Sequence, residues 1–171
     1  MTAQTPKCKK SARIFCWAVS LALILGYFGV TPKGVLGVEA RLPFAAFKAD
    51  VDLDIEDGEF ELMSTFTLGA GNNGVDPAAE TVSLRVSGGT AVFSVNIPAG
   101  SFKKDRSDHF TFQGTVDKVR VVASIRPLRN DAFEFEMEGE RVNLRGVANP
   151  VTVNLTIGDD GGSRSISAKI E

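Results

Sequence analysis

Residues 50–68 read DVDLDIEDGEFELMSTFTL, and this stretch decides the fold class. Apolar and polar residues alternate on both sides of Asp57-Gly58, with a period of two rather than the 3.6 of a helix. Successive side chains of a β-strand point to opposite faces, so each half predicts a strand with one buried and one solvated face. Asp-Gly is a residue pair that a tight hairpin turn favours. The stretch therefore predicts a β-hairpin.

The same period-two pattern recurs along the rest of the chain. It marks the further runs 82–86, 93–97, 110–112, 119–125, 133–137, 142–144, 151–157 and 166–170. Turn residues separate the runs, at Gly88-Gly89, Asp117-Lys118 and 158–162. No stretch shows the helical periodicity that a βαβ crossover needs. About ten short strands at roughly 8–12-residue spacing predict an all-β fold, an antiparallel β-sandwich in preference to a barrel.

Residues 1–40 differ in composition from the rest. The first thirteen residues carry four basic and no acidic side chains, and residues 14–30 carry no charge. A basic start, an apolar middle and a small-x-small sequence ending at Ala40 are typical of an export signal. We therefore expect cleavage between Ala40 and Arg41, which leaves a single domain of residues 41–171. Because the apolar run exceeds the usual signal length, an uncleaved membrane anchor is the alternative.

The composition of residues 41–171 excludes several kinds of site. This part of the chain holds 20 acidic and 14 basic residues, and no Cys, Trp or Tyr. Disulfides, zinc–thiolate sites and cysteine nucleophiles are therefore excluded from it. The acidic excess argues against nucleic-acid binding. Sugar-binding sandwiches usually present flat amphipathic aromatic side chains to the ligand. Here the aromatic residues are Phe on the apolar side of the strands, which makes a glycan-binding site less favoured without excluding it.

Two motifs imitate catalytic or nucleotide-binding sites. Residues 69–74 spell G-x-G-x-x-G, but a dinucleotide site needs a helix to begin there, and Pro77 and a further strand follow instead. We interpret the motif as a glycine-rich loop. His109 is the single histidine and has no nucleophile signature, so we expect an exposed side chain. The sequence predicts no catalytic or cofactor-binding residue and no cofactor.

The acidic residues raise two alternatives. Residues 50–54 with Glu61 imitate a calcium loop, but Ile55 stands where an EF-hand requires glycine. Paired carboxylates could also serve a hydrolase. The acids of residues 134–140, however, alternate with apolar residues as on a solvated strand face. We therefore predict solvated carboxylates and no metal-binding residue.

An internal similarity without gaps relates residues 58–97 to residues 131–170, at an offset of 73. Phe60-Glu61-Leu62 matches Phe133-Glu134-Phe135, and Gly88-Gly89-Thr90 matches Gly161-Gly162-Ser163. The similarity has two interpretations. The chain contains a duplicated unit whose halves pack together, or two β-meanders with similar turns resemble one another by chance.

Three strings carry a likeness to other sequences: FTLGAGNNGVDPAAETVSLRV (66–86), IPAGSF (97–102) and NPVTVNLTIGDDGG (149–162). They resemble a group of secreted bacterial β-rich segments with no assigned activity. The likeness covers most of residues 50–170. It implies export and an all-β structure, and it implies no ligand and no mechanism.

Together these features predict an exported, non-enzymatic β-sandwich, periplasmic or extracellular. We expect it to be a structural or protein-interaction module of the cell envelope or exterior. The expected partner is a protein of unknown identity, with no nucleic acid and with membrane contact only through residues 14–30 if they are uncleaved. The alternatives are a surface-carboxylate hydrolase and a weak calcium- or glycan-binding domain. Carboxyls converging in a cleft would favour the enzyme, whereas a long exposed edge strand or an apolar patch would favour a protein partner.

Overall fold

The computed structural model describes residues 42–171, which belong to one compact unit. The expected export segment 1–40 and the cleavage site at Ala40 and Arg41 lie outside the described residues. Within the described part the chain forms twelve strands. No helix there is long and apolar enough to cross a membrane.

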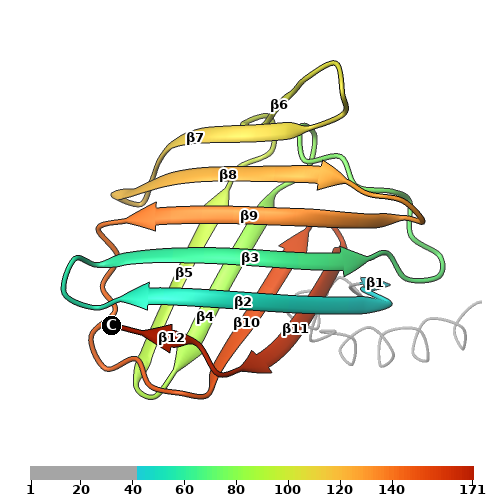
Figure 1. The fold of residues 1–171 in the computed structure, drawn as a ribbon. Helices are drawn as coiled ribbons and strands as arrows, with labels where there is room; N and C mark the ends of the chain where they lie inside the picture. Colours follow the sequence, from blue (N-terminus) through green and yellow to red (C-terminus); the bar gives the residue numbers. More distant parts are fainter. Residues whose placement is uncertain (1–41) are drawn as a thin grey trace, which may run out of the picture. The chain divides into compact units, whose positions relative to one another are not determined.

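The strands form two sheets, which Figure 1 shows as two layers whose strands cross. The five-stranded sheet has the order β1-β11-β10-β4-β5. Its strands are β1 (Leu42–Pro43), β11 (Asp160–Ile166), β10 (Val151–Ile157), β4 (Val82–Gly88) and β5 (Ala91–Ile97). All of its neighbours pair antiparallel except β1 and β11, which pair parallel.

The seven-stranded sheet has the order β12-β2-β3-β9-β8-β7-β6. Its strands are β12 (Lys169–Ile170), β2 (Ala46–Asp54), β3 (Glu59–Thr67), β9 (Ala132–Glu140), β8 (Val119–Pro127), β7 (Phe110–Val116) and β6 (Lys103–Lys104). Only the β12–β2 pair is parallel among the strand pairs of this sheet in the described residues. The strand that follows β3 in the chain therefore belongs to the other sheet, and the chain returns to pair β9 with β3.

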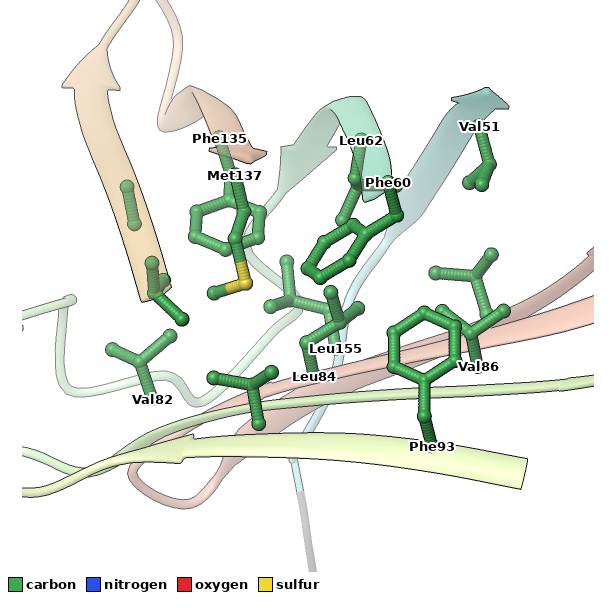
Figure 2. Packing of buried hydrophobic residues seen from close by; sticks show 14 of the residues in the cluster. Val51, Phe60, Leu62, Val82, Leu84, Val86, Phe93, Phe135, Met137 and Leu155 are labelled. Atoms are coloured by element: carbon green, nitrogen blue, oxygen red, sulfur yellow. The ribbon is translucent and has the colours of Figure 1, made fainter. Parts of the chain in front are cut away.

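The core lies between the two sheets. Phe60, Leu62 and Met137 of the seven-stranded sheet point toward Leu84 and Leu155 of the five-stranded sheet (Figure 2). Each of these side chains is buried. Burying such a side chain contributes about 1.5–3 kcal/mol, so the alternating residues supply the main stabilising term. The structure confirms the predicted all-β sandwich.

The hairpin predicted from residues 50–68 is formed by β2 and β3. Gly58 adopts a positive φ of 68° in the turn between them, a conformation that glycine adopts without a Cβ penalty. The Asp54 carboxylate accepts hydrogen bonds of 3.0 Å from the backbone N–H groups of Glu56 and Asp57. An aspartate that satisfies backbone donors two and three residues later is a common way to fix a turn.

Several local predictions are wrong. The strand predicted over 166–170 is divided: Ile166 ends β11 of the five-stranded sheet, Ala168 has no strand pairing, and β12 belongs to the seven-stranded sheet. Residues 142–144 were expected to be a strand, but Val142 and Leu144 are buried by a loop without strand pairing. The turn expected over 158–162 consists of Gly158 and Asp159 alone, because β11 begins at Asp160. Apolar alternation reports burial, and a loop that packs across the open end of a sandwich shows the same alternation.

The offset of 73 residues holds for one pair of strands and not for the next two. It superposes β3 on β9, which pair with each other in the sheet. β10 and β11 begin four residues earlier than the offset from β4 and β5 places them. Gly161 and Gly162 consequently lie within β11, whereas Gly89 lies in a turn. Duplication therefore stays a hypothesis.

Candidate functional site

The sequence motifs occupy separate parts of the fold. Residues 69–74 lie in the loop between β3 and β4, which leads into a strand. His109 lies just before β7, with its side chain 41% exposed and Nδ1 3.7 Å from the Asp105 carboxylate. Lys104 pairs with Asp108 at 2.9 Å in the same exposed segment. The structure brings none of these groups together with the acids of β2, β3 and β9.

Those acids form rows across the outer face of the seven-stranded sheet. Asp52 of β2 lies directly opposite Glu61 of β3, and Glu61 lies directly opposite Glu138 of β9. Asp54, Glu59 and Glu140 form the next row in the same way. Like charges directly opposite one another destabilise a sheet, so these rows carry a cost in folding free energy.

Cations lie at the ends of the two rows. Lys169 Nζ lies 3.8 Å from Asp52 and 3.0 Å from Glu171, and Arg120 lies 3.1 Å from Glu140. The hydrogen bond to Glu171, followed by the charges of Glu171 and Asp52, raises the pKa of Lys169. Exposed ion pairs of this kind contribute about 0–1 kcal/mol each. They offset the repulsion at the margins of the rows.

Both rows line a hollow of about 430 Å³ on this outer face. Its carboxylates come from β2, β3 and β9 and lie side by side along the sheet. The arrangement is that of a solvated strand face, as the alternation predicted. Among residues 42–171 no group of three His, Cys, Asp or Glu side chains is placed to hold a metal ion.

A different feature lies at the edge of the five-stranded sheet. β5 pairs with β4 along its whole length and has no strand on its other side (Figure 1). The side chains of Val92, Ser94 and Asn96 are exposed to solvent, and Val92 is 56% exposed. Phe93 and Val95, which alternate with them, face the core.

The backbone of β5 offers free hydrogen-bonding groups at this edge. The two-residue turn at Gly89-Thr90 makes Gly88 and Ala91 the pair that closes the hairpin, and such a pair exchanges backbone hydrogen bonds. Bonding toward β4 then alternates along the strand, so the N–H and C=O groups of Val92, Ser94 and Asn96 point away from β4. Within residues 42–171 these groups have no backbone hydrogen bond to another segment.

The other three sheet edges differ from β5. β1, β6 and β12 are two residues long, and they carry Pro43, two lysines and Lys169, respectively. Short edge strands, proline and lysine are the features by which proteins prevent unwanted strand pairing. β5 has seven residues, AVFSVNI, without charge or proline. Its edge is the one strand edge in the described chain that stays unpaired over a full seven residues, whereas residues 112–116 of β7, beyond β6, form a shorter unpaired edge that also lacks charge and proline.

The outer side chains next to this edge are small and mostly uncharged. Ser94 lies opposite Arg85 of β4, which lies opposite Asn154 of β10. Ser83 and Asn96 form a neighbouring pair, and Thr156 lies opposite Ser83. These residues line a hollow of about 460 Å³. The two outer faces therefore differ: one is rich in carboxylates, and the other carries hydroxyl and amide groups around one arginine.

Asp160 is a buried acid that the sequence interpretation placed in a turn. It is the first residue of β11, opposite Ile157 of β10 and beside Leu42 of β1. Its side chain is 0% exposed, and neither carboxylate oxygen has a hydrogen-bond partner among the described residues. Burial, followed by the charges of Asp159 and Glu80, raises the pKa of this carboxyl. No sequence signal distinguishes Asp160 from the half-buried Asp159 beside it.

Comparison with protein-family models, with curated proteins and with solved structures gives no match. The free edge of β5 and the carboxylate rows are therefore interpreted from their own chemistry.

Proposed function

We propose that this protein is an exported, non-enzymatic interaction module of the cell envelope or exterior that binds a protein strand at the edge of β5. One observation carries the proposal: β5 presents a full-length, uncharged and unpaired edge whose outward backbone groups belong to Val92, Ser94 and Asn96. Strand addition to such an edge obtains affinity from main-chain hydrogen bonds and specificity from alternate side chains.

The contrast among the four edges supports this function. A free edge promotes aggregation; β1, β6 and β12 cover two residues each of β11, β7 and β2, whereas β5 has no covering strand at all. β5 is a seven-residue edge strand without charged side chains, which is consistent with a function as a docking strand. The carboxylate rows support a hydrolase less well, because the acids that line their hollow stand in parallel rows along one sheet face and are paired at the row ends by Lys169 and Arg120.

In-cell photo-crosslinking tests the proposal. A photoreactive residue at position 94 of the full chain should give a discrete protein adduct in the producing cell. Position 154, in the same cross-strand row but two strands inward, is the matched control. Position 113 of β7, beyond the reach of the two-residue β6, tests the opposite edge. Adducts at 113 or 154 without one at 94, or no adduct at any position, would contradict the proposed function.

A further inference from the structure

We infer that the strand bound at the edge of β5 is β5 of a second copy, and that the two strands pair antiparallel about a two-fold axis at Ser94. The inference rests on the proposed function of this edge and names its partner. A two-fold interface is self-complementary, because each residue meets the symmetry-related position of the other copy.

The backbone register fits this pairing. The outward N–H and C=O groups belong to Val92, Ser94 and Asn96, which are spaced symmetrically about Ser94. In the antiparallel dimer Ser94 lies opposite Ser94 of the second copy, and Val92 lies opposite Asn96. All three are positions that exchange hydrogen bonds in an antiparallel ladder. Each unpaired group at the edge of one copy therefore finds its partner in the other.

The charge distribution permits a second copy to approach this edge. Residues 41–171 carry 20 acidic and 14 basic residues, so the net negative charge of this part of the chain disfavours self-association. The acids of β2, β3 and β9 lie on the outer face of the other sheet. Near the axis the nearest charged residue of the five-stranded sheet is Arg85, one strand inward from Ser94. The two arginines would be separated by three strand spacings of about 4.8 Å, beyond the Debye length of about 8 Å at physiological ionic strength.

The inner face of β5 is already buried in each copy, so the pairing relies on the backbone and outer face of the strand. Ala91 and Phe93 retain 7% and 9% of their exposure, whereas Val95 and Ile97 are 1% and 0% exposed. The dimer places Phe93 opposite Val95 and Ala91 opposite Ile97 of the other copy. In the dimer, the slightly exposed Ala91 and Phe93 of one copy thus lie beside the fully buried Ile97 and Val95 of the other. The two five-stranded sheets become one continuous sheet.

Sedimentation velocity on the protein recovered from the producing cell tests the dimer. The wild type should shift from monomer toward dimer between micromolar and near-millimolar concentration. Ser94→Lys places two ammonium groups directly opposite each other and should raise the dissociation constant at least about tenfold, or about 1.4 kcal/mol. Asn154→Lys adds the same charge to the same face away from the edge and should leave the dissociation constant unchanged. Ser94→Pro removes an N–H that points to solvent, which an edge strand tolerates, and should give a monomer with the wild-type melting curve.

A disulfide measures the register. With Cys8 and Cys16 replaced by Ser, a Ser94→Cys variant should form an intermolecular disulfide on mild oxidation, because opposed Cα atoms of a hydrogen-bonded pair are about 5.5 Å apart. The corresponding Asn154→Cys variant should not. A wild type that stays monomeric at every concentration would overturn the dimer. If position 94 nevertheless crosslinks to a different protein in the cell, the proposed function stands and the self-pairing fails.

Discussion

Asn149 and Ala168 are joined by two hydrogen bonds between an amide side chain and a backbone. Asn149 Nδ2 donates to the Ala168 carbonyl oxygen at 2.8 Å, and the Ala168 N–H donates to Asn149 Oδ1 at 2.7 Å. Asn149 lies in the loop before β10, and Ala168 lies between β11 and β12. One side chain thus connects that loop to the segment through which the chain passes from one sheet to the other.

Asn149→Ala should lower the free energy of unfolding by about 2 kcal/mol. Each of the two hydrogen bonds contributes about 1 kcal/mol net, and the Ala168 groups lose their partner in a partly buried site. Urea denaturation followed by far-UV circular dichroism measures the change. Asn143→Ala is the control, because its side chain accepts a single exposed bond of 3.3 Å from Arg145 N–H. Equal losses of unfolding free energy for the two substitutions would show that the two hydrogen bonds to Ala168 contribute no additional stability.

Asp160→Asn should stabilise the protein at neutral pH, because the amide carries no charge into the buried site. The wild-type carboxylate is buried without a partner among the described residues, and substitution removes its charge. Because burial and neighbouring acids raise the pKa of Asp160 above the ordinary 3.8, the folded state binds a proton more tightly than the unfolded chain. Stability from this group is therefore present below pH 3.8 and is lost as the pH rises through the folded-state pKa.

Melting temperatures of wild type and Asp160→Asn across pH 3–8 test that dependence. Their difference should be small at acidic pH and should widen toward neutral pH, while other carboxylates affect both proteins equally. Asp159→Asn, at the half-buried neighbouring position, should show a smaller dependence. A pH-independent difference between wild type and Asp160→Asn would contradict a buried ionisable group at this position.

Gly139→Ala should destabilise the sandwich by about 1–3 kcal/mol. Gly139 of β9 lies opposite Phe60 of β3, and a Cβ at this position would overlap the Phe60 ring. The backbone of Gly139 is not left-handed, so the expected cost is steric. Adding Phe60→Leu should recover part of the loss if the ring causes it. Gly139→Ala with wild-type stability would show that the ring moves aside freely.

The sequence predicts the sandwich well because alternation and burial are the same physical fact. Val51, Leu53, Phe60 and Leu62 are buried on the face that the period-two pattern assigned to them. The pattern fails at Val142 and Leu144, where a loop buries side chains without strand pairing. It says nothing of strand order, which is set by contacts far apart in the chain.

The sequence could predict the kind of candidate site, but not where in the fold it lies. A long exposed edge strand is the feature that favours a protein partner, but which strand lies at an edge depends on the pairing of β4 with β10. The carboxylate rows were expected to be solvated. Asp160 could not be found, because its burial results from a turn of two residues rather than five.

Processing after Ala40 predicts a spectroscopically distinctive product. Trp17 and Tyr27, the single Trp and Tyr of the chain, both precede Ala40. The form recovered from the producing cell should therefore show Phe absorbance bands without Trp fluorescence. Its mass should equal that of a chain that begins at Arg41. A product of intact mass that requires detergent and emits Trp fluorescence would identify the uncleaved anchor instead.

Truncation after Asn130 should abolish folding of the first half. The missing strands are interior in both sheets: β9 lies between β3 and β8, and β10 lies between β4 and β11. Their removal takes Phe135, Met137, Leu155 and Ile157 from the core, each at most 1% exposed. At about 1.5–3 kcal/mol for each buried side chain, the loss approaches or exceeds a total stability of about 5–15 kcal/mol.

The fragment 41–130 should therefore be unfolded or aggregated, and circular dichroism with thermal melting distinguishes this from a folded unit. Exposure of β3, β8 and β4 along newly unpaired edges would also favour aggregation. Supplying residues 131–171 as a separate chain should restore strand signal, because the missing strands would again fill interior positions. A soluble 41–130 fragment that melts cooperatively would instead show that the two halves of the chain are independent units.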